Sequence, residues 1–340
     1  MRRIFVKKEN IIYKTPNSLL MVDLTDKKLL YEVFWDCRQT HTQLAKKLRV
    51  SKQVVSYRIA QLEKQKILVS YHALIDWRKL GYSAIRIYWK WQDMTPQDEE
   101  EFYKYVRNDP LFMWSVKFEG EIDIGYYVWV KTIPEFAKKW FEILSRVRKN
   151  ILKQEIYESV AMVHYPMKPL VDRFIIDEKV LGLGKEEQYD DTDYELLRAV
   201  TEYARMPLVD LAQRISLTPK AALYRLKALE KKGIIMGYQA FIDTDLLGYR
   251  FYKVDYYLKS MQRLSEMYEF AKNHANIVYV MRTIGGPDYE IEVMVRDVVE
   301  LNKIINEIRN RFADVIQFHR HHRFEYTLKR VYLPGEKIRS

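Results

Sequence analysis

Polar side chains at helical spacing stand out in two short stretches of this sequence. The first stretch, 51–64, reads SKQVVSYRIAQLEK, and the second, 218–231, reads TPKAALYRLKALEK. Hydroxyl, amide, ammonium and guanidinium groups are the donors and acceptors that bind base edges in the major groove and phosphates along DNA. The candidate contacts are Ser51, Lys52, Gln53, Ser56, Tyr57 and Arg58 in the first stretch, and Thr218, Lys220, Tyr224, Arg225 and Lys227 in the second.

Each stretch has the pattern of an amphipathic helix. The apolar residues Val54, Val55, Ile59 and Leu62 fall at helical spacing, and Ser51 stands where an N-cap is expected. A shorter helical pattern at 42–48 precedes it across a three-residue turn. A short helix, a tight turn and a longer helix with a polar leading face predict a helix-turn-helix. The alternative is an ordinary polar helix face, in which Arg58 would pair with Glu63.

The whole chain repeats itself at a shift of 167 residues. Tyr57-Arg58 falls on Tyr224-Arg225, and Leu80-Gly81-Tyr82 falls on Leu247-Gly248-Tyr249 without a gap. Further on the shift falls to 165, because Gly120 aligns with Gly285. We therefore interpret the chain as a tandem duplication.

The second part of each repeat changes from helical periodicity to a mixture of strands and helices. After a strand at 67–75, which predicts a wing or hinge, strand and helix patterns alternate in the order βαββαβ. That order is the ferredoxin-like arrangement. The predicted fold is therefore α+β, with two copies of a winged or hinged helix-turn-helix followed by a ferredoxin-like domain.

The segments follow from these patterns. Pro166, Pro169 and a charged run interrupt the chain between the copies, where we expect a linker with a short ordered piece at 171–177. We predict an N-terminal arm with helix-turn-helix domain 1 at 1–82, ferredoxin-like domain 1 at 83–165, a linker at 166–190, helix-turn-helix domain 2 at 191–249 and ferredoxin-like domain 2 at 250–334.

The helix-turn-helix motif of this sequence resembles that of a known family. The run LAxxLxVSxxxVxxRIxxLExxxIL from Leu44, followed by Tyr71, Asp76 and Gly81, resembles the Lrp/AsnC, or feast/famine, regulators, and it recurs in the second copy. The resemblance implies sequence-specific transcription regulation, a homodimer through the ferredoxin-like domains and an amino acid or related effector. Because the chain carries two such domains, they could equally pair with each other within one chain. It implies an effector-site loop at the turns that contain Gly120, Asp123, Gly285, Gly286 and Asp288, for which a plain hairpin turn is the alternative. Family members usually carry one copy per chain, whereas this chain carries two.

Composition and charge agree with a polyanionic partner. The chain has 340 residues, a net charge of +11 and a pI of about 9.3, which favours double-stranded DNA over a membrane. Residues 24–70 carry +6 and residues 191–237 carry +2, so the first copy is expected to bind DNA more strongly. The single cysteine, Cys37, excludes an intrachain disulfide and suits a reducing compartment. No run is long and apolar enough for a membrane span and the start is not a signal peptide, so we expect a cytoplasmic protein.

Enzymatic chemistry has little support in the sequence. No phosphate loop, catalytic triad or zinc spacing is present, so we predict no enzyme, no cofactor and no metal. His319 and His321 share one strand face, which is more typical of a solvated or nucleic-acid-facing strand than of a metal site. The alternative from another class is an enzyme that resembles siroheme decarboxylases, which look like this same two-part fold and bind a tetrapyrrole. The residues available for that role are His164, His319, His321 and Arg320. A small-molecule sensor without DNA binding is the third possibility.

Overall fold

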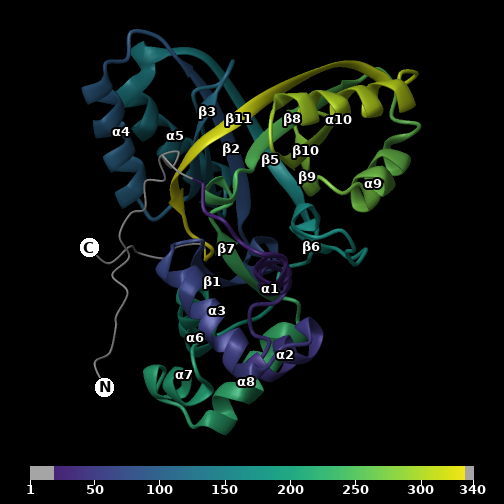
Figure 1. Ribbon diagram of the computed structural model, residues 1–340. Helices are drawn as coiled ribbons and strands as arrows, with labels where there is room; N and C mark the ends of the chain where they lie inside the picture. The colour runs from purple at the N-terminus through teal and green to yellow at the C-terminus, as the bar shows by residue number, and fades with distance from the viewer. Residues whose placement is uncertain (1–18, 334–340) are drawn as a thin grey trace.

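The molecule has a lower part made of helices and an upper part built around a sheet, as Figure 1 shows. The computed structural model describes residues 19–333. The arm expected at the start of the chain lies for the most part outside these residues. The lower part contains both helix-turn-helix modules, and two pairs of helices flank the sheet in the upper part.

Three helices open each copy. In the first copy they are α1 (Leu24–Trp35), α2 (His41–Leu48) and α3 (Lys52–Lys64), and in the second α6 (Asp191–Glu202), α7 (Leu208–Arg214) and α8 (Pro219–Lys231). The cap predicted for α3 is confirmed, because the Ser51 hydroxyl accepts a hydrogen bond from the Val54 N–H at 3.2 Å. Arg49 ends α2 with φ of 59°, which gives the sharp turn between the two helices.

The two helix-turn-helix modules are interlocked. Strands β1 (Leu68–Ile75) and β7 (Ile235–Ile242) pair antiparallel with each other, so the strand expected as a wing or hinge is a ribbon shared by both copies. Helix α1 of the first copy packs on β7, and α6 of the second copy packs on β1. Apolar side chains of both modules therefore form one core, which includes Leu29, Val55, Leu196 and Leu226.

The βαββαβ order is confirmed in both copies. The first consists of β2 (Ser83–Trp91), α4 (Pro96–Asn108), β3 (Phe112–Glu119), β4 (Ile124–Val130), α5 (Ile133–Val147) and β5 (Ile151–His164). The second consists of β8 (Arg250–Leu258), α9 (Leu264–Asn273), β9 (Ile277–Ile284), β10 (Tyr289–Val295), α10 (Val298–Arg311) and β11 (Ile316–Arg330). In each copy the helices cover one face of the sheet, where alternate strand residues such as Ile87 and Val293 are buried against them.

The two ferredoxin-like sheets join within the chain and close on themselves. The strand order is β2-β4-β3-β11-β8-β10-β9-β5, and β2 also pairs with β5. Strands β3 and β11, and strands β5 and β9, cross from one copy to the other. Of the two pairings that the sequence left open, the structure has the intrachain one. Residues that point away from the helices therefore lie inside a closed sheet.

The segment between the copies contains the predicted ordered piece and two short elements beside it. A 3-10 turn (Lys168–Leu170) and the short strand β6 (Lys179–Leu181) flank residues 171–177, which form neither helix nor strand. Residues 171–177 are nevertheless ordered, because Val171 and Phe174 pack against the core and the Tyr31 hydroxyl accepts the Ile175 N–H at 2.9 Å. Strand β6 pairs antiparallel with the end of β5.

Candidate nucleic-acid interface and a buried cavity

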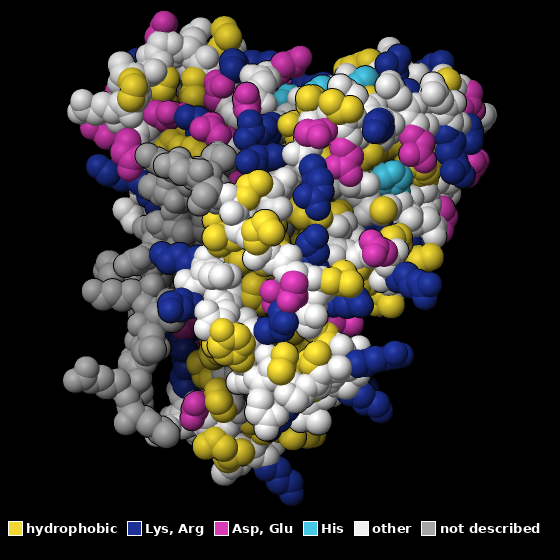
Figure 2. Space-filling model, in the orientation of Figure 1, with side chains coloured by type: hydrophobic (Ala, Val, Ile, Leu, Met, Phe, Trp, Pro, Cys, Tyr) yellow, Lys and Arg dark blue, Asp and Glu magenta, His cyan; other side chains and the backbone are white. Residues whose placement is uncertain are grey.

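Helices α3 and α8 expose the face on which the predicted DNA contacts lie. Lys52, Gln53 and Ser56 are exposed, and Tyr57 and Tyr224 have 65% and 76% of their surface accessible. Figure 2 shows Lys and Arg side chains projecting from the lower half of the molecule, where Figure 1 places both modules. The arrangement offers an electrostatic and hydrogen-bonding surface of the kind that the major groove requires.

Two members of this predicted face have local structural roles. Ser51 and Thr218 cap their helices, since each hydroxyl accepts a backbone N–H at 3.2 Å. Val54 was predicted to lie on the buried stripe, but 36% of its surface is exposed, whereas Val55 is fully buried. The buried stripe of α3 therefore starts one residue later, and Val54 adds an apolar group to the exposed face.

The two arginines of the face are bound to the first helix of their own module. Arg58 Nη1 donates to Asp26 Oδ1 at 2.7 Å and to Asp23 Oδ2 at 2.8 Å, and these carboxylates raise its pKa. Arg225 makes the equivalent contacts with Asp193 and Asp190. Both arginines thus tie the reading helix to the N-terminus of the first helix. The alternative pair of Arg58 with Glu63 is not formed, because Glu63 accepts a hydrogen bond from Tyr71 at 2.7 Å.

This geometry predicts a difference between Arg58 and Lys52 in DNA binding. Replacing Lys52 with alanine is expected to reduce the salt dependence of binding by about one counterion, as loss of a phosphate contact does. Arg58→Leu is expected to weaken binding several-fold with an unchanged salt slope, because two carboxylates already balance its charge. Binding isotherms between about 50 and 200 mM salt measure both slopes. A slope reduced equally by both variants would show that Arg58 contacts phosphate directly.

The second reading helix has fewer free polar groups than the first. Lys227 lies 2.6 Å from the Glu230 carboxylate, whereas Lys52 forms no salt bridge with any residue in 19–333. At the position equivalent to Ser56 the second copy has Leu223, which is 42% exposed. These features agree with the expectation from charge that the first copy is the stronger DNA binder.

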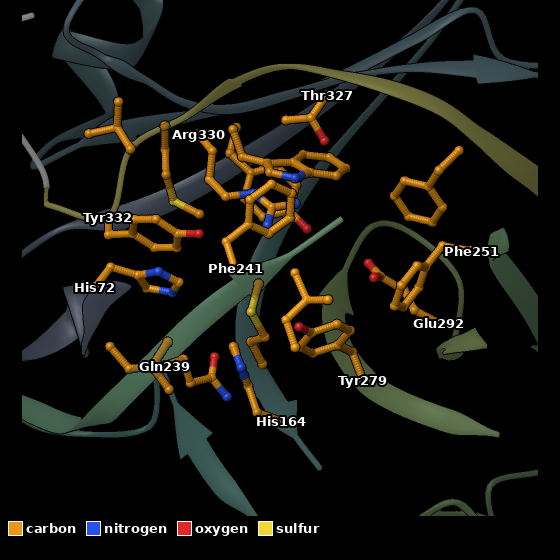
Figure 3. A pocket seen from close by; sticks show the side chains of 18 of the residues that line it. His72, His164, Gln239, Phe241, Phe251, Tyr279, Glu292, Thr327, Arg330 and Tyr332 are labelled. Carbon is orange, nitrogen blue, oxygen red and sulfur yellow. The ribbon is translucent and has the colours of Figure 1, made fainter. Parts of the chain in front are cut away.

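A cavity that is partly open to solvent lies at the end of the closed sheet next to the β1/β7 ribbon. Its volume is about 200 Å³, and its walls include Trp114, Trp129, Phe241, Phe251 and Tyr279. Figure 3 shows His164 and Gln239 close together on one side, His72 beside Tyr332, and Glu292 across the cavity near Phe251. We call this space the ribbon cavity. Side chains from both copies and from both parts of the molecule therefore meet in it.

Several polar groups of the ribbon cavity are buried without a partner from the protein. Nδ1 of His72, both ring nitrogens of His164 and Nε2 of Gln239 accept or donate no hydrogen bond within residues 19–333. Burial, with a contribution from Lys179, lowers the pKa of His164 to about 3, although the Gln239 amide beside it favours protonation. Burial and Arg330 likewise lower the pKa of His72. Both imidazoles are therefore neutral near pH 7 and available for hydrogen bonds.

Comparisons with known proteins agree with this architecture. The winged helix-turn-helix DNA-binding family matches residues 22–69 and 189–236. An uncharacterised HTH-type transcriptional regulator of Pyrococcus furiosus is 30% identical over 126 residues, which is 36% of this chain and 81% of that protein. The chain belongs to the Lrp/AsnC family. The HTH-type transcriptional regulator LrpB of Bacillus subtilis, at 24% identity over 36% of this chain and 81% of its own length, is a further relative.

One solved structure shares the fold of this Lrp/AsnC chain over almost its whole length. The siroheme decarboxylase NirDL, in complex with an iron-uroporphyrin III analogue, superposes with a TM-score of 0.61 over 91% of this chain and 94% of its own. The identity is 13%, so the likeness shows a shared tandem fold. In residues 19–333 no helix is long and apolar enough to cross a membrane.

The turns expected to hold the Lrp/AsnC effector have their carboxylates bound to backbone. Asp123 Oδ2 accepts the Trp91 N–H at 2.7 Å, and Asp288 Oδ2 accepts the Leu258 N–H at the same distance. Gly120 and Gly285 have φ of 133° and 84°, a conformation that side chains rarely adopt. Gly286 lies against Tyr157, which leaves no room for a Cβ atom. None of these residues lines the ribbon cavity, and the turn geometry explains why glycine and aspartate occur there.

The histidines singled out in the sequence are dispersed by the fold. His319 and His321 lie on the same face of β11, with ring centroids 6.5 Å apart. His322 points into the closed sheet, where burial lowers its pKa to about 3. Arg320 is held by Asp255 Oδ2 at 3.1 Å and by Glu155. Within residues 19–333 no group of His, Cys, Asp and Glu is arranged to hold a metal ion.

Sequence reasoning missed most of the ribbon cavity. Of its polar residues only His164 was noted, whereas His72, Gln239, Glu292 and Arg330 were not. A signal was present, because His72, Gln239 and Glu292 are polar residues inside otherwise apolar strands. Such residues are expected to be buried only where they have a partner or a function. Cys37 is fully buried, and burial raises the pKa of its thiol to about 12.

The buried carboxyl group of Glu292 predicts a pH-dependent stability. Burial, and next the Glu290 carboxylate, raise the pKa of Glu292 to about 7. The folded protein thus holds this proton while the unfolded chain loses it, so stability falls as the pH rises from about 4.5 to about 7. Glu292→Gln is expected to abolish that contribution and to be more stable than the natural protein at pH 8 by about 1–3 kcal/mol.

Urea denaturation at pH 5 and at pH 8 measures this difference. Glu119→Gln is the control, since 64% of the Glu119 side chain is exposed, and its stability should follow that of the natural protein at both pH values. Equal stability of Glu292→Gln and the natural protein at pH 8 would mean that the pKa of Glu292 is not raised in the folded state.

Proposed function

We propose that this chain is a sequence-specific DNA-binding transcriptional regulator in which one polypeptide supplies a pair of reading heads. The observation that carries this proposal is the interlocked pair of helix-turn-helix modules, each with an exposed face on α3 or α8. In dimeric regulators two such helices occupy successive half-sites along one side of the duplex. Here the internal repeat supplies the approximate two-fold arrangement. The relatives that the chain resembles, which are HTH-type transcriptional regulators, support this proposal.

The proposal assigns a separate role to each segment of the chain. The helix-turn-helix domains at 1–82 and 191–249 bind DNA, the ferredoxin-like domains at 83–165 and 250–334 pair with each other, and residues 166–190 link the copies. A homodimer of whole chains would need a surface other than the strands that already join the two sheets. Since DNA is the proposed partner, the proposed location is the cytoplasm.

Selection from random genomic DNA fragments, followed by sequencing, tests the function. We expect a motif with two spaced half-sites, of which the half read by α3 contributes more affinity. The full chain is required, because deletion of residues 1–82 would remove β1 and half of the shared core. Binding without any motif would indicate an architectural protein, and no binding at low salt would favour a sensor without DNA binding.

A siroheme-decarboxylase-like enzyme is the second candidate. The neutral imidazoles of His72 and His164 in a shared cavity favour it. Its volume of about 200 Å³ is against it, because ligands of drug size occupy about 300–1,000 Å³ and a tetrapyrrole is larger than most of them. Arg320, which was available for this role in the sequence, is held by Asp255 and Glu155. Addition of an iron porphyrin with a record of its absorption spectrum tests this candidate.

A further inference from the structure

A local two-fold axis relates the two helix-turn-helix modules. In the β1/β7 ribbon Tyr71 is paired with Ala240, and Ala73 is paired with Tyr238. Tyr71 and Tyr238 are equivalent positions of the repeat, as are Ala73 and Ala240, so exchange of the two copies turns one pair into the other. The axis therefore passes through the ribbon and presents α3 and α8 in inverted orientation, as the reading helices of a dimer are at a palindromic site.

Contacts between the modules repeat this symmetry. Arg38 of the first copy donates to the Ala204 carbonyl of the second at 3.0 Å, and Arg205 of the second donates to the Cys37 carbonyl of the first at 2.9 Å. Within each module an arginine and two carboxylates hold the reading helix to the first helix in the same way. Equivalent residues of α3 and α8 therefore face equivalent base positions of their half-sites.

The reading faces of α3 and α8 differ in chemistry, although the frame that holds them is symmetric. At one exposed position α3 has Gln53 where α8 has Lys220, and one turn later α3 has Ser56 where α8 has Leu223. Leu223 has 42% of its surface exposed. The two helices thus offer different groups to the same base positions.

These groups select different bases. A glutamine amide such as that of Gln53 pairs with the N6 and N7 edge of adenine, and the Ser56 hydroxyl can donate or accept a hydrogen bond beside it. Leu223 has no polar atom, so it leaves the hydrogen-bonding groups of a base edge unpaired, and its favourable contact is the C5-methyl group of thymine. The half-site under α3 is therefore expected to contain adenine where the half-site under α8 contains a thymine methyl.

We propose that the DNA site of this chain is an imperfect inverted repeat, with adenine at Gln53 in one half and a thymine methyl at Leu223 in the other. Tyr57 and Tyr224 are exposed at equivalent positions, so the base that they face is the same in both halves. This inference rests on the proposed function and adds the base classes to it. Two different heads in one chain also give the bound protein a single direction along the DNA, which a dimer of identical heads at a palindrome does not have.

Three duplexes, assembled from the half-sites that selection supplies, test the inequality of the halves. One duplex has both halves, the second is a palindrome of the α3 half, and the third is a palindrome of the α8 half, all at the same spacing. Each palindrome is expected to bind the full-length natural chain at least about 10-fold more weakly, because one head then faces the wrong half. Equal affinity for the α3 palindrome and the site with both halves would overturn the proposal.

Deoxyuridine, which lacks only the C5-methyl group of thymidine, tests the contact of Leu223. Replacing thymidines of the α8 half one at a time is expected to reveal one position at which binding weakens about 3- to 5-fold in the natural chain. The same replacement should have no effect on Leu223→Ser, because serine leaves the methyl group without an apolar contact. Leu152→Ser is the matched control, since Leu152 is an exposed leucine of β5, outside the helix-turn-helix modules, and it should keep the natural response. An α8 half without any methyl-sensitive position would contradict the proposal.

A chain with two matching faces gives the reverse result. Lys220→Gln combined with Leu223→Ser gives α8 the polar groups of α3, and this variant should bind the α3 palindrome at least about 10-fold more tightly than the natural chain does. The comparison of the three duplexes uses the natural chain and stands even if the double variant does not fold.

The outcomes separate this inference from the proposed function. A perfect palindrome recovered by selection would refute the inequality of the halves and leave the DNA-binding regulator intact. A motif with a single half would refute base reading by α8. No binding to any DNA at low salt would refute the proposed function and this inference with it.

Discussion

Replacing Glu290 with leucine is expected to lower the free energy of unfolding by about 3–5 kcal/mol. Glu290 Oε1 accepts a hydrogen bond from Arg86 Nη2 at 2.6 Å, and Lys253 Nζ lies 3.1 Å from its other carboxylate oxygen. All three side chains are at least 99% buried inside the closed sheet. Burial by itself would lower the pKa of Arg86, but the Glu290 carboxylate outweighs it and the pKa is raised.

The cost arises because the variant leaves a buried charge without a carboxylate. Within residues 19–333, Lys253 keeps Asp255 as a partner, whereas Arg86 keeps the Tyr88 hydroxyl and the Tyr127 ring and has no ion-pair partner left. Since Arg86 lies on β2 and Glu290 on β10, this ion pair also joins the two copies of the repeat. Loss of this ion pair is expected to destabilise the closed sheet and therefore the ribbon cavity at its end.

Chemical denaturation of three variants measures the effect. The double variant Arg86→Met with Glu290→Leu removes both charges and should recover most of the loss. Glu119→Leu is the surface control and should cost less than about 1 kcal/mol, because its pair with Arg323 is exposed to solvent. A loss below about 1 kcal/mol for Glu290→Leu would mean that water or a rearranged partner compensates Arg86.

The second large effect is expected at Gln53 on the reading helix. A glutamine amide that pairs with an adenine edge contributes about 1–3 kcal/mol of discrimination, so Gln53→Ala should weaken binding to the selected site by about 10- to 100-fold. Gln53 lies in the first turn of α3 and is exposed, as a base-reading residue of a helix-turn-helix is. The loss should be confined to one base position and should not change the salt slope, because the amide is uncharged.

The internal repeat supplies the matched comparison for this variant. Lys220 occupies the position of Gln53 in the second copy and is also exposed. Lys220→Ala should weaken binding to all sequences alike and reduce the salt slope by about one. Selection and sequencing with each variant, together with isotherms at two salt concentrations, distinguishes the two results. An unchanged base preference for Gln53→Ala would assign sequence reading to other residues of α3.

Local sequence patterns predicted the elements of this protein closely. The helix expected at 42–48 is His41–Leu48, and the strand expected at 67–75 is Leu68–Ile75. These succeed because capping residues and the periods of apolar residues act over a few neighbouring positions. Because the sequence repeats, the helices and strands predicted for one copy are predicted for the other copy as well. Family membership and the α+β fold class follow from the same information.

Contacts between distant segments were decided by the tertiary structure. Arg58 was predicted to contact DNA, with a pair to Glu63 in its own helix as the alternative. The fold instead brings Asp23 and Asp26 within reach of Arg58, and Glu63 pairs with Tyr71. The sequence permitted pairing of the ferredoxin-like domains within or between chains, since both would satisfy the same strand edges. Within the chain, the linker keeps the partner edges close together, so the sheet closes without a second molecule.

The sequence alone thus determined two copies of a reading module and of a ferredoxin-like domain, with their elements, their family and their basic charge. Only the tertiary structure decided which polar residues meet. His72, His164, Glu292 and Arg330 are as far as 258 positions apart in the chain and come together only when the ribbon closes one end of the sheet. Local propensity cannot specify such a cavity, because its walls depend on the relative placement of elements from both copies.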